Sequence, residues 1–218
     1  MADYATARVN MIEGQIRPSK VSDDRVLAAM AAVPRERFVP KRLKGTAYVD
    51  ESLAVAPGRY LMEPAVFARL LQAAAIGPDD VVLDIGCATG YSTAVLARLA
   101  ATVVAVESDP EMVTAASDLL AELDVDNAAV VEGALEAGYA KQAPYDAIVL
   151  GGAVDEVPPA IAEQLAEGGR LVTVVTRGSP VGTGLLMLRA RGQLSRRVLF
   201  DASAPPLPGF AVDRGFVL

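Results

Sequence analysis

The sequence predicts an α/β fold in which helices cover both faces of a mostly parallel sheet. Four short runs of apolar and β-branched residues follow one another in the middle of the chain, and each ends in a polar or glycine-bearing segment. Helical patterns separate three of these runs. Strands that are apolar along their whole length and alternate with helices are typical of parallel sheets buried on both faces.

Two helices are expected before the sheet begins. The segment SDDRVLAAMAAV (22–33) places Ser22 at the N-cap, acidic residues in the first turn and apolar residues at helical spacing. The segment EPAVFARLLQAAAIG (63–77) has Pro64 at an early helical position and Gly77 past the end, where these residue types are favoured.

The rest of the chain supplies the expected strands. The first four are DVVLDIG (80–86), ATVVAVES (101–108), NAAVVEG (127–133) and YDAIVLGG (145–152). Helices are expected between them at STAVLARLA (92–100) and DPEMVTAASDLLAEL (109–123). Three later strands are RLVTVVTRG (170–178), GLLMLRARG (184–192) and LSRRVLFDA (194–202). We expect some of these three to pair antiparallel at one edge.

Length and composition indicate one domain with a short N-terminal extension. The chain has 218 residues, of which 52% are hydrophobic, enough to bury one sizeable core but scarcely two. Its formal net charge is -7 and its sequence pI is about 4.7, so the cationic surface that non-specific nucleic-acid binding requires is missing. We therefore expect no nucleic-acid partner. The oligomeric state does not follow from the composition.

Three features favour a reducing cytoplasm. No apolar run reaches the ~18 residues of a membrane span, because Asp84, Arg98 and Glu107 interrupt the most hydrophobic region. The start, MADYATARVNMIEGQIR, carries charges where a signal peptide has an apolar stretch, so we expect it to be retained. The single Cys87 cannot form an internal disulfide.

The chain contains no histidine. Ser-His and Cys-His nucleophile pairs, His-bearing zinc sites and imidazole general bases are therefore excluded. We expect chemistry that needs neither an imidazole nor a metal ion.

Candidate ligand-binding residues stand at the carboxyl ends of the expected strands: Asp84 with Gly86, Glu107, Gly133 with Ala134, and Gly151. In open parallel sheets, ligands bind beyond these ends, at the point where the strand order reverses. Glu107 follows Gly86 by 21 positions, the spacing at which an acid can accept hydrogen bonds from both hydroxyls of a ribose. The alternative is that Glu107 is a solvated charge at a strand end.

The turn after the first of these strands reads Gly86-Cys87-Ala88-Thr89-Gly90. A dinucleotide-binding turn reads G-x-G-x-x-G; here Ala88 replaces the middle glycine that lets the backbone approach a pyrophosphate, and no third glycine follows at that spacing. No Gly-Lys-Ser/Thr closes the turn, so a P-loop is excluded. A nicotinamide-dependent reductase is therefore disfavoured.

The ligand indicated is a nucleoside that carries a charged amino-acid tail instead of a pyrophosphate. S-adenosylmethionine fits this description. Asp84 can pair with its ammonium group, backbone N–H groups of the turn can bind its carboxylate, and Glu107 can bind its ribose.

Six stretches together resemble the protein-L-isoaspartate O-methyltransferase family, which consists of class I S-adenosylmethionine-dependent methyltransferases. They are NMIEGQIRP, DDRVLAAMAAVPRERFVP, AYVDESLAV, VLDIGCATGYSTAVLARLAATVVAVESD, PYDAIVLGGAVDEVP and IAEQLAEGGRLVTVV. The block VPRERFVP makes the resemblance specific, because other methyltransferases of this fold generally lack it. Members transfer a methyl group to the α-carboxylate of an isoaspartyl residue in damaged protein and release S-adenosylhomocysteine.

For the fold, the resemblance implies a Rossmann-like, seven-stranded, mostly parallel sheet with helices on both faces, over residues 63–218. Residues 1–62 would form a helical extension on the side of a protein or peptide substrate, within one compact unit. The cofactor-binding residues it implies are Asp84, Gly86, Cys87, Ala88, Gly90, Glu107, Ser108, Gly133, Ala134, Leu135 and Gly151.

Three segments depart from the family pattern. The family's stretch G-Q-T-I-S-Q-P, whose Ser lies beside the methyl donor and the substrate carboxylate, reads GRYLMEP here, with Tyr60 for Thr and Met62 for Ser. These two residues are the catalytic candidates. The family's G-D-G, whose Asp binds the adenine amino group, has Ala134 instead, so this contact falls to Glu132, Glu136 or the backbone. The family's Thr-Ala-Ala run likewise reads Gly-Gly-Ala at 151–153.

Structural roles stay open for several residues. Met62 is of a type that fills gaps in cores, and Cys87 is expected to be a small turn residue rather than a nucleophile. Arg35 and Arg37 either contact a substrate carboxylate or form surface ion pairs. Asp146 is expected to make a contact at the start of its strand.

Three functions remain open at this point. The chain is an active methyltransferase of this family, a related methyltransferase with another acceptor such as a small molecule, or a cofactor-binding partner protein without catalysis. Because of Met62, we expect isoaspartyl methylation to be weak or absent.

Overall fold

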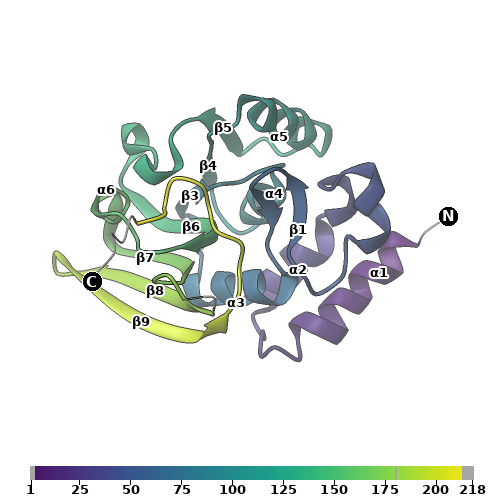
Figure 1. The fold of residues 1–218 in the computed structure, drawn as a ribbon, viewed down its shortest axis with the longest axis horizontal. Coiled ribbons are helices and arrows are strands. Elements are labelled where there is room, and N and C mark those ends of the chain that lie inside the picture. Colours follow the sequence, from purple (N-terminus) through teal and green to yellow (C-terminus); the bar gives the residue numbers. More distant parts are fainter. Residues whose placement is uncertain (1–2, 180, 213–218) are drawn as a thin grey trace, which may run out of the picture.

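A computed structural model describes residues 3–179 and 181–212, and a seven-stranded sheet runs through its middle (Figure 1). The spatial order is β5-β4-β3-β6-β7-β8-β9; β3 to β7 are parallel, whereas β8 pairs antiparallel with both of its neighbours. The strands are β3 (Val81–Ile85), β4 (Thr102–Glu107), β5 (Ala128–Glu132), β6 (Tyr145–Val154), β7 (Leu165–Val175), β8 (Gly182–Ala190) and β9 (Gln193–Ala202). The expected fold class and antiparallel edge are confirmed.

Helices lie before and between these strands. The α-helices are α1 (Tyr4–Met11), α2 (Asp24–Ala32), α3 (Pro64–Ala74), α4 (Tyr91–Leu96), α5 (Pro110–Glu122) and α6 (Pro159–Ala162). Shorter helical segments are the π-helix η1 (Ile12–Ile16) and the 3-10 turns η2 (Arg35–Arg37), η3 (Lys41–Thr46), η4 (Leu135–Ala137) and η5 (Ala140–Gln142). A two-stranded hairpin, β1 (Leu53–Ala56) and β2 (Arg59–Leu61), precedes α3. The sequence analysis did not predict this hairpin.

Two helix boundaries differ from expectation. The N-cap of α2 is Asp23, whose carboxylate accepts from the Arg25 and Val26 amides, so the expectation for Ser22 was one residue too early. At the end of α3, Ala75 adopts the left-handed conformation with φ 46°, a cap position usually given to glycine. Gly77 does lie past the end, but its part is to donate its amide to Asp80.

The sheet buries both faces because successive side chains point to opposite sides. Val82 packs in a cluster that includes side chains of α2, α3 and α4, whereas the next residue, Leu83, packs in a second cluster with α6 and the chain after β9. The first cluster also contains Met11 and Met30 of the N-terminal segment. The expected division into an extension, residues 1–62, and a sheet domain, residues 63–218, stays a prediction. Residues 1–2, 180 and 213–218 lie outside the described part of the chain.

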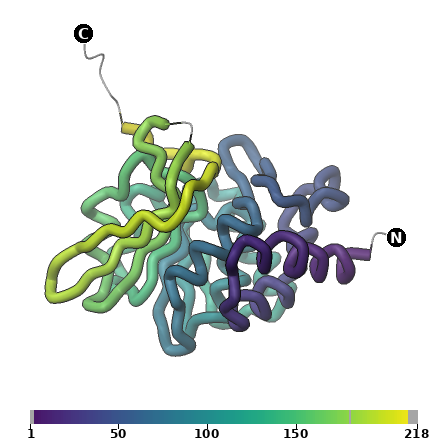
Figure 2. The backbone as a smooth tube through the Cα atoms, turned by 90° about the horizontal axis from the view of Figure 1, so that it is seen from below, coloured from purple at the N-terminus to yellow at the C-terminus, as the bar shows by residue number. Residues whose placement is uncertain are grey.

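The first helices and the last two strands lie on different sides of the molecule (Figure 2). Figure 2 shows the N-terminal helices at one end and the β8–β9 hairpin at the other. After β9 the chain runs back across the sheet (Figure 1) and reaches β6, where the Leu207 amide donates to Ala153 O over 2.8 Å and the Ala153 amide donates to Pro205 O over 2.8 Å. Among the described residues, no helix is long and apolar enough to cross a bilayer.

Candidate functional site

The glycine turn connects β3 to α4 at the point where the strand order reverses. Gly86, Ala88 and Gly90 all have positive φ angles, of 79°, 48° and 90°. Ala88 is a non-glycine residue in this region, which carries a steric cost, and its amide donates to Glu107 Oε2 over 3.1 Å. Gly90 stands at the N-cap of α4. The turn therefore lies between two strands whose carboxyl ends both carry acids.

Asp84 is the last residue but one of β3, on the face covered by α4, and is completely buried. Its Oδ2 accepts hydrogen bonds from Ser92 Oγ and Thr93 Oγ1, each over 2.7 Å. Its Oδ1 is buried and has no hydrogen-bond partner among the described residues. Burial raises the pKa of this carboxyl to about 6; the two hydroxyl donors oppose the shift and Glu107 adds to it. Asp84 thus offers an unused acceptor in a desolvated place.

Glu107 ends β4 and is also completely buried. Its Oε1 accepts from the Ser108 amide over 2.7 Å and from the Asp109 amide over 3.1 Å. It is therefore not the solvated strand-end charge that was considered as an alternative.

Arg59 supplies the cation that faces Glu107. Its Nε and Nη2 both lie 2.9 Å from Glu107 Oε1, and Nη2 also donates to Ser108 Oγ over 2.7 Å. The Arg59 side chain is 8% exposed. The sequence analysis did not include this arginine, because nothing in the local pattern showed that the hairpin would place it against the end of β4.

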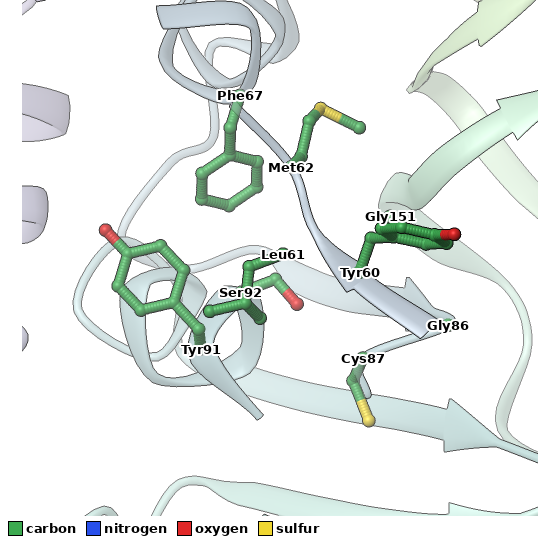
Figure 3. A pocket seen from close by; sticks show the side chains of 9 residues that line it. All are labelled: Tyr60, Leu61, Met62, Phe67, Gly86, Cys87, Tyr91, Ser92 and Gly151. Carbon is green, nitrogen blue, oxygen red and sulfur yellow. The ribbon is translucent and has the colours of Figure 1, made fainter. Parts of the chain in front are cut away.

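Tyr60 and Met62, the two catalytic candidates, line a cavity at the same end of the sheet (Figure 3). Gly86, Cys87 and Gly151 line it from the sheet side, so the structure brings these sequence-predicted residues together. Its accessible volume is about 20 Å³, which is close to the space of one water molecule. Met62 is buried and belongs to the core cluster that includes α3. It therefore both packs in the core and borders the cavity.

Cys87 behaves as a packing residue at the bottom of this cavity. Its side chain is 2% exposed, and burial raises the pKa of the thiol well above its usual value, with Asp84 and Glu107 adding to the shift. A thiol held in its neutral form is a poor nucleophile.

The glycines of the strand ends permit close approach of backbone and side chains. A Cβ on Gly151 would lie 2.8 Å from Gly86 O. A Cβ on Gly86 or Gly152 would lie 2.7 or 2.8 Å from side-chain atoms of Leu207. Leu207 was not predicted, because no sequence signal indicates that the chain after β9 returns to this place.

The residues expected near an adenine lie at the end of β5. The Gly133 amide donates to Glu107 O over 3.0 Å, which holds the two strand ends together. Ala134 is exposed, whereas the Leu135 side chain is 1% exposed in the second core cluster. Glu132 and Glu136 are both exposed. An adenine contact from any of these residues stays a prediction.

The two arginines of the VPRERFVP block have different surroundings. Arg35 is completely buried: it donates to Ala47 O and Met62 O over 2.8 and 2.9 Å, and its guanidinium lies 4.7 Å from the centre of the Tyr91 ring. It is thus no surface residue, and it fixes the backbone at Met62. Arg37 forms a surface ion pair with Glu122.

Asp146 has the structural role expected for it. Its Oδ2 accepts from the Val81 amide over 2.9 Å, so the start of β6 is tied to the start of β3. This contact lies at the opposite end of β3 from Asp84.

Comparisons with known proteins agree with this arrangement. A sequence model described as protein-L-isoaspartate(D-aspartate) O-methyltransferase (PCMT) matches residues 6–188. A protein-L-isoaspartate O-methyltransferase of Koribacter versatilis is 41% identical over 210 residues, which are 96% of this chain and 94% of that protein. One of Methanoculleus marisnigri is 44% identical over 168 residues, which are 77% of this chain and 76% of that protein.

Solved structures share the fold. A protein-L-isoaspartate O-methyltransferase superposes with a TM-score of 0.82 at 26% identity, over 93% of this chain and 66% of the other. A beta-aspartate methyltransferase (PCMT) from Plasmodium falciparum, in complex with S-adenosyl-L-homocysteine, superposes with a TM-score of 0.80 at 19% identity, over 95% and 99%. From the family match and these identities, the chain belongs to the protein-L-isoaspartate(D-aspartate) O-methyltransferase (PCMT) family.

Proposed function

We propose that this chain binds S-adenosyl-L-methionine in the crevice at the ends of β3 and β4 and transfers its methyl group to a carboxylate of a protein or peptide. The observation that carries the proposal is the pair of buried carboxylates, Asp84 and Glu107, on either side of the glycine turn. Two buried acids with only one arginine between them fit a ligand that brings a positive charge of its own.

The residues present suit this cofactor group by group. The Oδ1 atom of Asp84, which has no partner among the described residues, is the acceptor for the ammonium group. The two hydroxyls of the cofactor ribose donate to Glu107. The turn Gly86 to Gly90 precedes α4 directly. The amides of Gly86, Ala88 and Gly90 already donate to Val106 O, Glu107 and Cys87 O, so we assign the ligand carboxylate to the remaining amides of the turn. The assignment of individual residues to these groups is part of the proposal, as is the expectation that no metal takes part.

The transfer itself asks little acid–base chemistry of the protein. When bound, the cofactor supplies a methyl group on a sulfonium that is already a good leaving group. An acceptor carboxylate is ionised at pH 7 and attacks without a general base, which suits a chain that lacks histidine. The work left to Tyr60, Met62 and the surrounding apolar side chains is to orient the carboxylate and to exclude water.

The acceptor we propose first is an isoaspartyl residue, because the relatives at about 40% identity carry that name. A different carboxylate acceptor is the second candidate, and the observation that favours it is the cavity lining: Met62 and Tyr60 stand where the family stretch has Ser and Thr. A binding protein without catalysis remains the third possibility. We place the protein in the cytoplasm on the strength of its single, buried, free cysteine.

Labelled cofactor can separate these candidates. The protein would be incubated with S-adenosylmethionine carrying a labelled methyl group, together with an isoaspartyl peptide, the matching aspartyl peptide, or a cell extract. We expect slow incorporation of label into the isoaspartyl peptide and none into the aspartyl control. Carboxyl methyl esters release methanol in mild base, so base-stable label in the extract would indicate another acceptor chemistry. Cofactor binding without label in any sample would support the binding role.

A further inference from the structure

Arg59 is the one group around Glu107 that can leave. The other donors to this carboxylate are the backbone amides of Ala88, Ser108 and Asp109, and these are fixed by the turn and by the start of α5. Arg59 reaches Glu107 from outside the main sheet, on the short hairpin β1–β2.

The carboxylate has little capacity left while Arg59 is in place. Glu107 Oε1 already has four donor atoms within hydrogen-bond distance, and Oε2 has one, the Ala88 amide. A carboxylate offers about four acceptor sites in total. The two hydroxyls of a ribose would add two donors. Glu107 cannot accept hydrogen bonds from the two ribose hydroxyls and from the guanidinium of Arg59 at the same time, so the guanidinium must move away.

The cavity beside this ion pair points to the same movement. Its volume of about 20 Å³ is far below the ~300 Å³ of a small-ligand pocket. Of the residues that border it, Tyr60 directly follows Arg59 in β2 and Met62 comes one residue after the end of β2, while the sheet-side lining belongs to the glycine turn and β6. The hairpin has only three- and four-residue strands, and the turn between them at Pro57 and Gly58 is exposed. Leu53, Val55 and Leu61 of the hairpin are buried in the first core cluster, but within the described residues the hairpin forms no ladder with the seven-stranded sheet. It can therefore shift without breaking hydrogen bonds between strands of that sheet.

We propose that Arg59 is an internal competitor of the cofactor ribose for Glu107, so that cofactor binding releases the β1–β2 hairpin and opens the cavity for the acceptor. This inference rests on the proposed function, since it assigns Glu107 to the ribose. Its consequence is an order of binding: the cofactor enters first, and Tyr60 and Met62 are free to receive the acceptor only afterwards.

The alternative, that Arg59 supports cofactor binding, predicts the opposite change in affinity when Arg59 is removed. If Arg59 stayed on Glu107 and oriented it for the ribose, its removal would weaken nucleoside binding. If Arg59 competes, its removal raises the fraction of binding-competent protein, and the affinity rises by the same factor. For an open state populated at about 10%, the gain is about tenfold.

The test is calorimetric titration of S-adenosylhomocysteine into the full chain and its Arg59→Gln variant. Gln removes the charge but keeps length and a donor, and it is the residue of the family stretch at this position. Arg17→Gln is the matched control, because Arg17 pairs with Glu13 on the exposed N-terminal surface. We expect Arg59→Gln to bind about tenfold tighter and Arg17→Gln to bind like the parent.

A second ligand shows whether the gain arises at Glu107. A 2′,3′-dideoxy analogue of S-adenosylhomocysteine lacks the hydroxyls that compete with Arg59, so Arg59→Gln should give it no comparable gain. Equal or weaker binding of S-adenosylhomocysteine by Arg59→Gln, or an equal gain for the analogue, would overturn the inference. If neither protein binds S-adenosylhomocysteine at all, the proposed function itself fails.

Loss of the buried ion pair can also destabilise the fold, so circular dichroism of each variant is needed. If Arg59→Gln does not fold, Arg59→Lys takes its place, since it keeps the charge but has fewer donors to hold Glu107. It should bind more tightly than the parent, and binding that is unchanged or weaker would contradict the inference. Amide hydrogen exchange supplies the independent readout: residues 53–61 should exchange faster when S-adenosylhomocysteine is bound to the parent, whereas a purely structural arginine would leave them equally or better protected.

Discussion

Asp84 and Glu107 are two fully buried carboxylates at the ends of neighbouring parallel strands, and they are held in opposite ways. Asp84 accepts hydrogen bonds from two neutral hydroxyls on one oxygen, and no donor in residues 3–179 or 181–212 reaches the other. Glu107 accepts backbone amides on both oxygens and an arginine on one of them. The crevice therefore has one acid whose charge is unbalanced and one whose charge is already balanced.

This difference indicates which parts of a ligand each end receives. An uncompensated buried carboxylate favours a cation, whereas a compensated one favours neutral donors such as hydroxyls. A nucleoside with a cationic tail satisfies both ends. At Glu107, the nucleoside can bind only by replacing the charge-assisted contact with Arg59. We therefore expect mutations at Asp84 and at Glu107 to have different effects.

We expect the largest effect of mutation at the position that faces the carboxylate of the acceptor, and we expect it on the rate of methyl transfer. Met62 presents a thioether with almost no donor capacity where the family stretch has a hydroxyl, and loss of one aligned donor commonly costs ~10²–10³ in rate. We expect slow isoaspartyl turnover in the parent and a gain of that order in the double variant Met62→Ser, Tyr60→Thr. Initial rates with labelled cofactor measure this.

Met62→Leu is the control for that gain, since it keeps an apolar side chain and should leave the rate unchanged. Parent turnover as fast as that of a family relative assayed beside it would show that Tyr60 or the backbone supplies the missing donor. Met62 would then be a packing residue only.

At the Asp84 end, the expected effect is on stability and depends on pH. Because the pKa of Asp84 rises from 3.8 to about 6 on folding, its favourable contribution is complete below pH 3.8 and is lost as the pH rises through 6. Above pH 6 the parent therefore has the free-energy cost of an ionised, buried carboxylate, and Asp84→Asn removes this cost. The variant should equal the parent near pH 4 and exceed it by roughly 3 kcal/mol at pH 7.5 in its free energy of unfolding. Urea unfolding across this range measures the difference, and a constant difference at all pH values would argue against a raised pKa.

At the Glu107 end, the expected effect is on affinity. Charge-assisted hydrogen bonds contribute roughly 1.5–3 kcal/mol each, so Glu107→Ala should weaken S-adenosylhomocysteine binding at least about tenfold. Glu122→Ala is the control, since Glu122 pairs with Arg37 on the surface. Equal affinities by calorimetry would remove Glu107 from the site. Nicotinamide dinucleotides should not compete in the same experiment, because the Ala88 methyl group denies a pyrophosphate close approach.

We expect the smallest effect from relieving backbone strain outside the crevice, and this effect should be on stability alone. Ala75 and Ala88 both have positive φ, but Ala75 is exposed at the end of α3, before β3 begins, whereas Ala88 is buried in the turn between the two acids. Ala75→Gly should stabilise the fold by about 0.5–1 kcal/mol without changing nucleoside affinity. A rise in melting temperature of a few degrees would show it; a change in affinity would mean that α3 transmits strain to the site.

The sequence predicted the sheet and its acids better than it predicted what faces them. Asp84, Glu107 and the glycine turn are predicted from residues within one strand–turn–helix–strand unit, β3 to β4, where spacing along the chain determines spacing in the fold. Arg59 and Leu207 reach the same crevice from segments 48 residues before Glu107 and after the last strand of the sheet. Contacts of this kind depend on the path of irregular chain, for which local patterns hold no signal. The hairpin was missed for the same reason, since its strands of three and four residues carry too little periodicity.

The return of the chain after β9 bears on the order in which the molecule is made. Leu207 is hydrogen-bonded to Ala153 and fills the space beside Gly86 and Gly152, yet it is synthesised after all seven strands of the sheet. A growing chain can pair its parallel strands as they emerge, but the floor of the crevice stays incomplete until this segment has been added. We therefore expect the sheet to be able to form before the crevice is complete, and a released chain truncated before Pro205 to keep the sheet but to lack this part of the crevice.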